Sequence, residues 1–192
     1  MLNQLLAHFN SNRLLHRCQF GFTKGRSTTD AGASLIQHIF SAWEGSQDAL
    51  GIFCDLSKAF DCVDHETLLL KLKHYGISDT SLIRTYLDRR IQKVCINDVF
   101  SLGSPLRMGV PQGSILGPFL FLVYINDLPF MVERIAEAVL FADDTSLIFK
   151  LKRGENNFDV VNNALRLIVD WFSTNNLLLN SKRTGHLRVG LA

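Results

Sequence analysis

Apolar residues recur at two spacings along this chain, and each spacing predicts a different kind of element. Spacings of three and four residues predict amphipathic helices at 2–15, 30–43, 64–75, 79–89 and 158–172, and a dense apolar run predicts a core helix at 119–128. Apolar runs of strand length predict strands at 50–54, 91–96 and 177–179 and a two-stranded hairpin at 138–149. Strands interleaved with helices predict an α+β fold with an antiparallel sheet backed by helices.

Local signals mark where two of these helices begin and where one strand turns. Asp30 and Asp64 are suitable caps for the second and third helices. Asn97-Asp98 predicts a turn that follows the strand at 91–96. The expected apolar face of the second helix consists of Leu35, Ile36, Ile39 and Phe40.

The hairpin at 138–149 carries two adjacent acids, Asp143 and Asp144, at its turn. Asp is a common turn former because its side chain bonds its own backbone, so this segment alone favours a solvated turn. Asp55 changes that interpretation, because it ends the apolar strand at 50–54 in the same way. If the two strands are neighbours, three carboxylates meet at one rim of a sheet, and like charges held so close require a cation.

Magnesium suits such a group of carboxylates. Mg²⁺ takes oxygen ligands and keeps sites for water and substrate phosphates. Two such ions about 4 Å apart stabilise the attacking and leaving oxygens of a phosphoryl transfer. We therefore expect Asp55, Asp143 and Asp144 to be catalytic, metal-binding residues with two Mg²⁺ ions, which Mn²⁺ could replace.

Three further segments fit phosphoryl transfer, although each also has a simple structural explanation. The loop at 19–29 mixes glycines, hydroxyls and aromatics with Lys24 and Arg26, which suits phosphate contact or, equally, a solvated basic loop. Phe60, five residues after Asp55, could lie beside a sugar or belong to the core. Gln112 and Gly113 open a helix, where they could approach a nucleotide or form a helix-entry turn.

Composition narrows the class of protein. The 192 residues are 47% hydrophobic and 20% charged, typical of a globular chain and not of a disordered one. A net charge of +2 does not by itself indicate nucleic-acid binding. No apolar run approaches the roughly 20 residues of a membrane span, so no membrane partner is expected. Cys54 and Cys95 lie in apolar runs, which predicts buried, reduced thiols.

Four ordered motifs resemble those of reverse transcriptases, most of all the jockey-type, LINE-like non-LTR retrotransposons. The palm motifs are FCDLSKAFD at 53–61, PQGSILGP at 111–118 and FADD at 141–144, and the fingers motif is QFGFTKGRST at 19–28. The likeness runs from about residue 2 to 184. It implies a right-hand polymerase fold with partial fingers at about 1–49, mainly palm with interleaved fingers elements at 50–184, a truncated tail at 185–192 and no thumb.

The resemblance also implies an activity and its partners. The chain would be an RNA-directed DNA polymerase that adds deoxynucleotides to a DNA primer on an RNA template in retrotransposon replication. Its place of action would be intracellular, and nuclear by family.

The same resemblance assigns a role to each motif residue. Asp55 and Asp143 would be the main metal ligands and Asp144 the third carboxylate. Phe60 would exclude a ribose 2′-hydroxyl. Arg26 would contact the incoming triphosphate, and nucleotide or template contacts would come from Lys24, Gln112, Gly113 and Lys182.

Two single residues depart from the family pattern. Thr23 replaces a basic residue that is common in the fingers motif, and Arg183 replaces the lysine expected as the general acid for pyrophosphate. Arginine holds its proton too tightly for that role unless adjacent Lys182 substitutes. The larger departure is length, because proteins of this family normally have more fingers before such a core, a thumb after it and often an endonuclease domain. The alternative that this leaves open is a truncated, non-catalytic remnant that keeps the palm fold, with weak or no nucleic-acid binding. A viral-type RNA polymerase shares the geometry of the acids, but Phe60 disfavours it.

Overall fold

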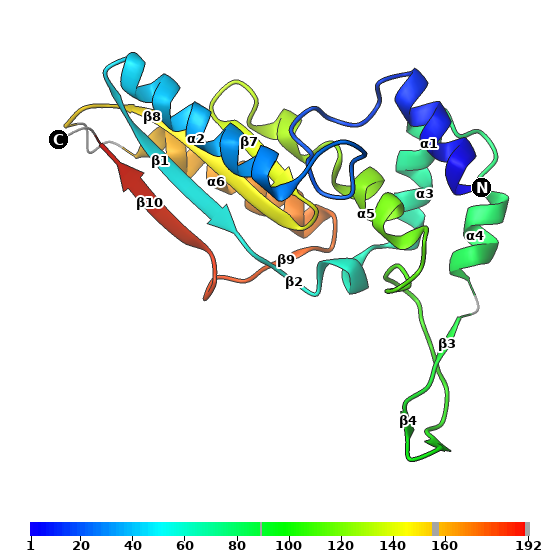
Figure 1. Cartoon of the computed structure of the whole chain (residues 1–192). Helices are drawn as coiled ribbons and strands as arrows, with labels where there is room; N and C mark the ends of the chain where they lie inside the picture. The colour runs from blue at the N-terminus through cyan, green and yellow to red at the C-terminus, as the bar shows by residue number, and fades with distance from the viewer. Residues whose placement is uncertain (89, 155–157, 191–192) are drawn as a thin grey trace.

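The computed structural model describes residues 1–88, 90–154 and 158–190, and it contains a central antiparallel sheet (Figure 1). Strand β1 (Gln47–Cys54) pairs with β8 (Asp144–Lys152) and β10 (Gly185–Val189), and β7 (Glu137–Phe141) pairs with β8. The order is therefore β10-β1-β8-β7. β7 and β8 form the predicted hairpin. The sequence analysis expected no strand at β10, because this edge strand is exposed along much of its length and carries little apolar signal.

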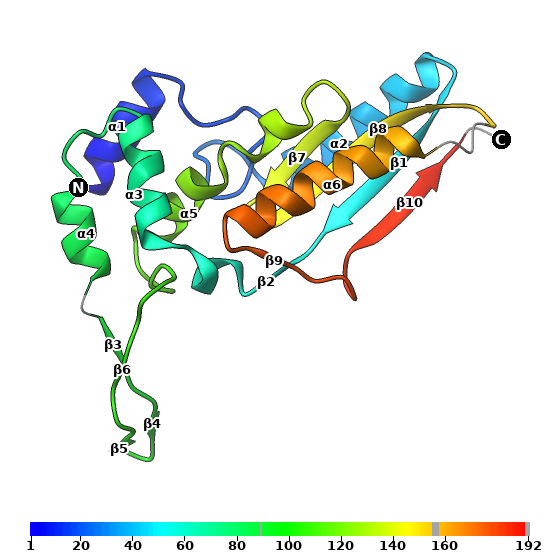
Figure 2. The ribbon, with the colours of Figure 1, turned by 180° about the vertical axis from the view of Figure 1, so that it is seen from behind.

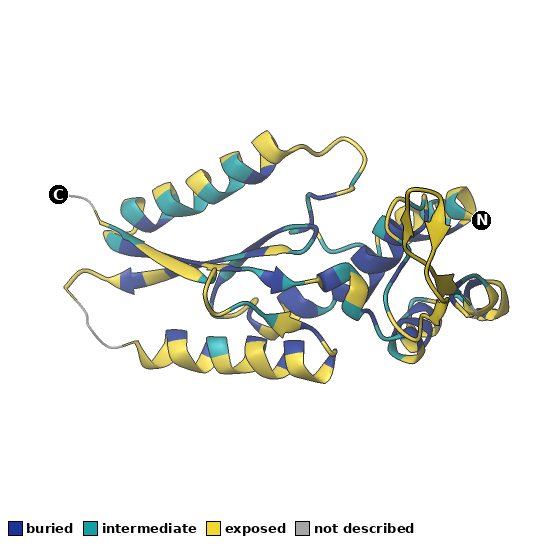
Figure 3. Cartoon of the chain, turned by 90° about the horizontal axis from the view of Figure 1, so that it is seen from below, coloured by how far each residue is buried: buried dark blue, intermediate teal, exposed yellow. Residues whose placement is uncertain are grey.

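Two helices cover the sheet, one on each face. Helix α2 (Thr28–Glu44) lies in front of the sheet in Figure 1, and α6 (Asp159–Thr174) lies in front of it in the opposite view of Figure 2. Figure 3 shows these layers from below, with buried positions on the sides of the helices that face the sheet. α6 buries Val161, Ile168 and Phe172, as its periodicity predicted.

Helix α2 differs from its prediction at its cap and on its apolar face. Ser27 is the N-cap, so the predicted Asp30 cap is wrong. Ser27 Oγ accepts the Asp30 N–H at 3.2 Å, and the Asp30 carboxylate accepts the Ser27 N–H at 2.7 Å, which makes a capping box. On the predicted apolar face, Leu35 and Ile39 pack against the sheet, whereas Ile36 and Phe40 are exposed. The buried residues of α2 are instead Ala31 and Ala42. Their small side chains let the helix approach the sheet closely.

A second group of helices lies beyond one end of the sheet, on the far side of α5 (Gly117–Ile125) (Figure 1). These helices are α1 (Leu2–Ser11), α3 (His65–His74) and α4 (Ser81–Leu87). Residues 119–125 of α5 are all buried, which confirms the predicted core helix, although it ends at Ile125 and a 3-10 turn, η2 (Leu128–Met131), follows. Asp64 caps α3 as predicted and accepts the Thr67 N–H at 2.8 Å.

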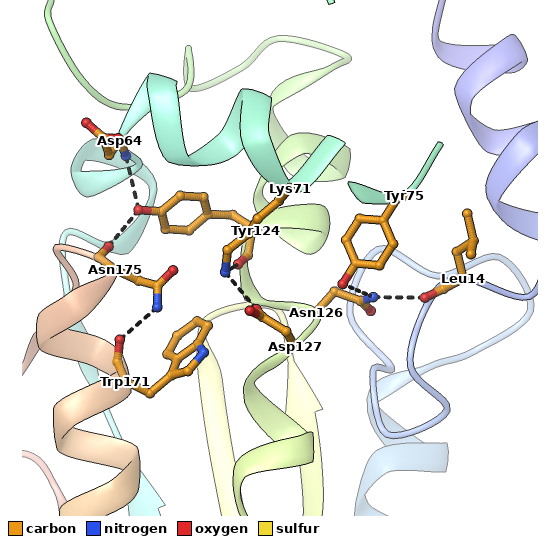
Figure 4. A network of polar contacts seen from close by, with 9 residues as sticks. All are labelled: Leu14, Asp64, Lys71, Tyr75, Tyr124, Asn126, Asp127, Trp171 and Asn175. Atoms are coloured by element: carbon orange, nitrogen blue, oxygen red, sulfur yellow. Dashed lines mark hydrogen bonds and ion pairs between the residues drawn. The ribbon is translucent and has the colours of Figure 1, made fainter. Parts of the chain in front are cut away.

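Buried and half-buried polar groups connect these helices to α6 (Figure 4). Lys71 of α3 donates to Asp127 Oδ1 and to Tyr124 O, both at 2.7 Å. The Tyr124 hydroxyl donates to Asn175 O at 2.6 Å, just past the end of α6. Burial raises the pKa of Tyr124 to about 12 and lowers the pKa of Lys71, because desolvation disfavours the charged form of each group. The network therefore fixes the second helix group against the sheet layers.

A β-ribbon between α4 and α5 projects away from the rest of the molecule (Figures 1 and 2). β3 (Ile91–Gln92) pairs with β6 (Ser104–Pro105), and β4 (Cys95–Ile96) pairs with β5 (Val99–Phe100). Asn97 and Asp98 form the predicted turn, with φ of +49° and +63°. Cys95 is exposed, so its predicted burial is wrong, whereas Cys54 is buried. In the ranges that the structure describes, no helix combines the length and apolarity needed to cross a bilayer.

Candidate active site

The turn of the acid-bearing hairpin is two residues long and holds only the first of the two adjacent acids. Phe141 of β7 pairs with Asp144 of β8, so Ala142 and Asp143 alone form the turn. Ala142 has a φ of +57°, in the left-handed region that residues with a Cβ adopt at a cost. A backbone held in this region requires support from the surrounding structure.

Gln19 provides part of that support. Its side chain is buried, and Oε1 accepts the Ala142 N–H at 3.1 Å and the Gly21 N–H at 2.8 Å. The other end of the amide, Nε2, is buried without a partner within the described residues. Gln19 therefore joins the fingers-motif loop to the acid-bearing turn through its oxygen.

Backbone contacts bring the same loop still closer to β7. Phe20 N–H donates to Leu140 O, and Leu140 N–H donates to Cys18 O, each at 2.8 Å. A Cβ on Gly21 would lie 2.3 Å from Ala142 N, so glycine is required there for steric reasons. The sequence analysis gave Gln19 and Gly21 no role; the only available signal was a glycine inside a polar and aromatic loop.

Asp55 follows β1 directly, beside the start of β8. Cys54 pairs with Thr145, the neighbour of Asp144. The chain then forms β2 (Leu56–Ser57), which pairs with β9 (Leu178–Leu179). The structure thus brings Asp55, Asp143 and Asp144 to the same end of the sheet, as the strand-end argument anticipated.

The pairing of β2 with β9 also brings Asn180 onto Asp55. Asn180 N–H donates to Asp55 O at 2.8 Å, and Asn180 Nδ2 donates to Asp55 Oδ2 at 2.9 Å. The sequence analysis gave Asn180 no role, because its partner lies 125 residues away along the chain.

A cavity of about 510 Å³ opens between α2 and the acid-bearing end of the sheet. Asp55, Asp144 and Arg183 contribute its charged groups. Its apolar wall includes Leu35, Phe53, Val139 and Phe141. The cavity combines apolar area with a few convergent charges, which is the usual character of a ligand site.

The electrostatics of the acids indicate a need for positive charge. Partial burial, and then the charges of Asp143 and Asp55, raise the pKa of Asp144 above its ordinary value. Among the described residues, no three His, Cys, Asp or Glu side chains are grouped so that they could hold a metal ion by themselves. Carboxylate donors at this end of the sheet nonetheless suit Mg²⁺, since this ion binds through one or two carboxylates and takes its other ligands from water and substrate phosphates.

The two basic residues of the fingers motif are placed differently from each other. Lys24 is exposed. Arg26 Nη1 donates to the carbonyl oxygens of Arg17 and Gln19, the latter at 3.0 Å, and its guanidinium lies 4.8 Å from the Phe20 ring centre. Arg26 lines a cavity of about 470 Å³ with Arg17 and Glu137, separate from the one that contains Asp55 and Asp144.

Phe60 and Gln112 lie in segments that contact each other. Phe60, in the 3-10 turn η1 (Ala59–Cys62), is half-buried and stacks on Phe121 with ring centres 4.4 Å apart. Gln112 Nε2 donates to Asp61 Oδ1 at 2.9 Å. Gly113 has a φ of +76°, and a Cβ there would meet nothing within 4 Å. Glycine is needed at this position for its backbone conformation and not for space.

Two adjacent cations follow β9, both exposed, and only the arginine lines the cavity of the acids. Arg183 contributes to the cavity with Asp55 and Asp144. Lys182 is exposed, and its N–H donates to Asn180 Oδ1 at 3.3 Å.

Comparison with known proteins assigns the chain to a family. The family model "Reverse transcriptase (RNA-dependent DNA polymerase)" matches residues 1–188. The chain belongs to the reverse transcriptase family. The predicted kinship with non-LTR elements is also confirmed, because relatives of this reverse transcriptase chain include RNA-directed DNA polymerases of Drosophila melanogaster mobile elements. That of jockey is 29% identical over 97% of this chain, and the probable polymerase of transposon BS is 34% identical over 77% of it.

Solved structures support the right-hand polymerase fold. Apo telomerase from Candida tropicalis, truncated from its C-terminal domain, superposes with a TM-score of 0.75 at 13% identity, covering 99% of this chain and 40% of that one. Telomerase of the same organism with a fragment of telomeric RNA gives a TM-score of 0.74 at 12% identity, covering 97% and 33%. The chain spans about one fifth of the two polymerase relatives, 21% of the jockey protein and 17% of the transposon BS protein.

Proposed function

We propose that this chain provides the catalytic core of an RNA-directed DNA polymerase that copies an RNA template from a DNA primer with deoxynucleoside triphosphates. The observation that carries the proposal is the convergence of Asp55, Asp143 and Asp144 beside a cavity within a reverse transcriptase fold. The proposed process is retrotransposon replication, with a nuclear site of action. The relatives named for the same activity support this proposal.

In the proposed reaction the primer 3′-hydroxyl attacks the α-phosphate of the nucleotide and pyrophosphate leaves. Asp55, Asp143 and Asp144 would hold two Mg²⁺ ions, which when bound stabilise the attacking and leaving oxygens. The protein itself mainly positions the reactants. β1 and β8 fix Asp55 and Asp144 on adjacent strands, and the Gln19 contact fixes the turn that carries Asp143.

Arg183 would serve the phosphates and not the proton transfer. Its side chain lines the cavity beside Asp55 and Asp144. Because a guanidinium remains charged, it would stabilise the negative charge that develops on leaving pyrophosphate instead of donating a proton. Lys182, exposed on the neighbouring position, would contact template or nucleotide phosphates.

The remaining motif residues would shape the nucleotide and template pocket. Phe60 is held by Phe121 on one face and by an edge contact to Phe22 at 6.3 Å between ring centres. A ring fixed in this way would exclude a ribose 2′-hydroxyl. Gln112 and Gly113 would contact the nucleotide or template, and Lys24 and Arg26 would contact phosphates from the fingers motif.

Primer extension with the purified protein tests the proposal. A DNA primer on an RNA template should be extended with Mg²⁺ and deoxynucleotides, and Asp143→Asn should reduce extension to background. Asp170→Asn is the matched control, because Asp170 is exposed on α6 and belongs to no part of the site. Unchanged extension by Asp143→Asn would refute the assignment of the acids.

Two further outcomes of the same assay identify the alternatives. No extension by the wild-type protein, with the fold intact, would indicate a non-catalytic remnant. Incorporation of ribonucleotides as efficient as that of deoxynucleotides would indicate an RNA polymerase and would remove the gate role from Phe60.

A further inference from the structure

We propose that Asn180 is a positioning residue that fixes the Asp55 carboxylate in the orientation in which it would hold a divalent cation, an inference that rests on the proposed polymerase function. Asn180 contacts Asp55 twice. Its backbone N–H donates to Asp55 O at 2.8 Å, and its side-chain Nδ2 donates to Asp55 Oδ2 at 2.9 Å.

The orientation of the Asn180 amide is determined by its other contact. Oδ1 accepts the Lys182 N–H at 3.3 Å, so Nδ2 is the atom that faces the carboxylate. If the amide were flipped, Oδ1 would face the Asp55 carboxylate and Nδ2 would face the Lys182 N–H. Both hydrogen bonds would then be lost. The amide donates to Asp55 Oδ2 and does not contact Asp55 Oδ1.

A fixed carboxylate matters for an ion with strict coordination geometry such as Mg²⁺. Mg²⁺ demands near-ideal octahedral geometry, so a carboxylate that is free to rotate loses much of its value as a ligand. Hydrogen bonds to ligating carboxylates supply this restraint, and their removal typically costs 10–100-fold in metal affinity or activity. Asn180 is suited to this role because its amide is neutral and adds no charge to a group of three acids.

The side chain and the backbone of Asn180 have separable roles. The backbone bond to Asp55 O, together with the pairing of Leu56 with Leu179, connects β2 to β9 without the side chain. A change confined to the side chain should therefore preserve the strand connection and lose only the contact with the carboxylate.

The first measurement is metal binding in the absence of nucleic acid. Mn²⁺ binding, followed by electron paramagnetic resonance, should be 10–100-fold weaker in Asn180→Ala than in the wild type. The urea midpoint should change little, and extension should recover as Mg²⁺ is raised. Asn163→Ala is the control, because Asn163 is exposed on α6. Mn²⁺ affinity equal to that of the wild type would overturn the inference.

A second variant keeps the test decisive if Asn180→Ala folds poorly. Asn180→Asp retains an acceptor for the Lys182 N–H but loses the donor to Asp55. Its added charge can attract the cation in the absence of nucleic acid, so the readout is extension at limiting Mg²⁺, which should fall 10–100-fold. Wild-type extension by this variant would overturn the inference. Failure of the proposed function is a separate result, since it requires either an inactive wild type or an active Asp143→Asn.

Discussion

Gly21→Ala should separate the fingers-motif loop from the hairpin that carries the acids. The added Cβ would lie 2.3 Å from Ala142 N, 2.9 Å from Phe141 C and 3.1 Å from Ala142 Cα, all of them backbone atoms that cannot rotate away. Ordinary contact begins at 3.4 Å, so the loop and the hairpin must move apart by about 1 Å.

The cost follows from the contacts that this movement breaks. Leu140 forms two 2.8 Å backbone bonds with Cys18 and Phe20, and each such bond contributes about 0.5–1.5 kcal/mol. Residual overpacking adds about 1–3 kcal/mol. We expect the free energy of unfolding to fall by about 2–6 kcal/mol, a large part of the stability of a typical domain.

Urea unfolding followed by circular dichroism measures this change. Gly185→Ala is the matched control, because a Cβ there meets nothing within 4 Å, and its effect should stay within about 1 kcal/mol. Extension by the folded fraction of Gly21→Ala should also fall, since the turn at Ala142 loses its support. A Gly21→Ala protein as stable as the Gly185→Ala protein would refute this reasoning.

Two further predictions concern single polar groups. Partial burial and two neighbouring carboxylates raise the pKa of Asp144 above 3.8. Without metal, the folded chain therefore keeps this proton to a higher pH than the unfolded chain does. The free energy of unfolding should then fall as pH rises from 3.8 through the folded pKa. Urea titrations from acid to neutral pH should show a smaller fall for Asp144→Asn, and an unchanged fall would contradict the prediction. Tyr124→Phe should lower the free energy of unfolding by about 1–3 kcal/mol, measured by thermal unfolding, because Asn175 O loses its donor. Tyr86→Phe is the control and should be neutral, because the buried Tyr86 hydroxyl has no partner among the described residues. Equal effects of the two changes would count against this account.

Periodicity was a reliable guide wherever one layer packs on another. The hairpin of β7 and β8, helix α5 and three of the buried positions of α6 were predicted, because their apolar residues face a core. On α6 the buried Ala164 and Trp171 were missed, and Phe158 and Val169 are exposed although they were predicted to lie on the apolar face. It failed for Ile36 and Phe40, since α2 approaches the sheet through alanines instead. It failed again for Cys95, whose ribbon is covered on neither side.

The candidate site was predictable in its acids but not in its supports. Asp55 and Asp143 could be inferred because each ends an apolar strand. Gln19, Gly21 and Asn180 could not, since their roles depend on contacts with residues more than 100 positions away. Such contacts arise from the tertiary fold and leave no local pattern of charge or hydrophobicity.

The projecting ribbon, residues 91–105, is a segment whose length can change at little cost to the rest of the fold. Its hydrogen bonds close within the ribbon, from the pairing of Ile91 with Pro105 to that of Ile96 with Val99, so the core does not depend on its length. Lengthening such a loop costs little free energy, about 0.6 kcal/mol for each doubling. Insertions or exchanges at this point could therefore accumulate between mobile elements while the sheet that bears the acids stays unchanged.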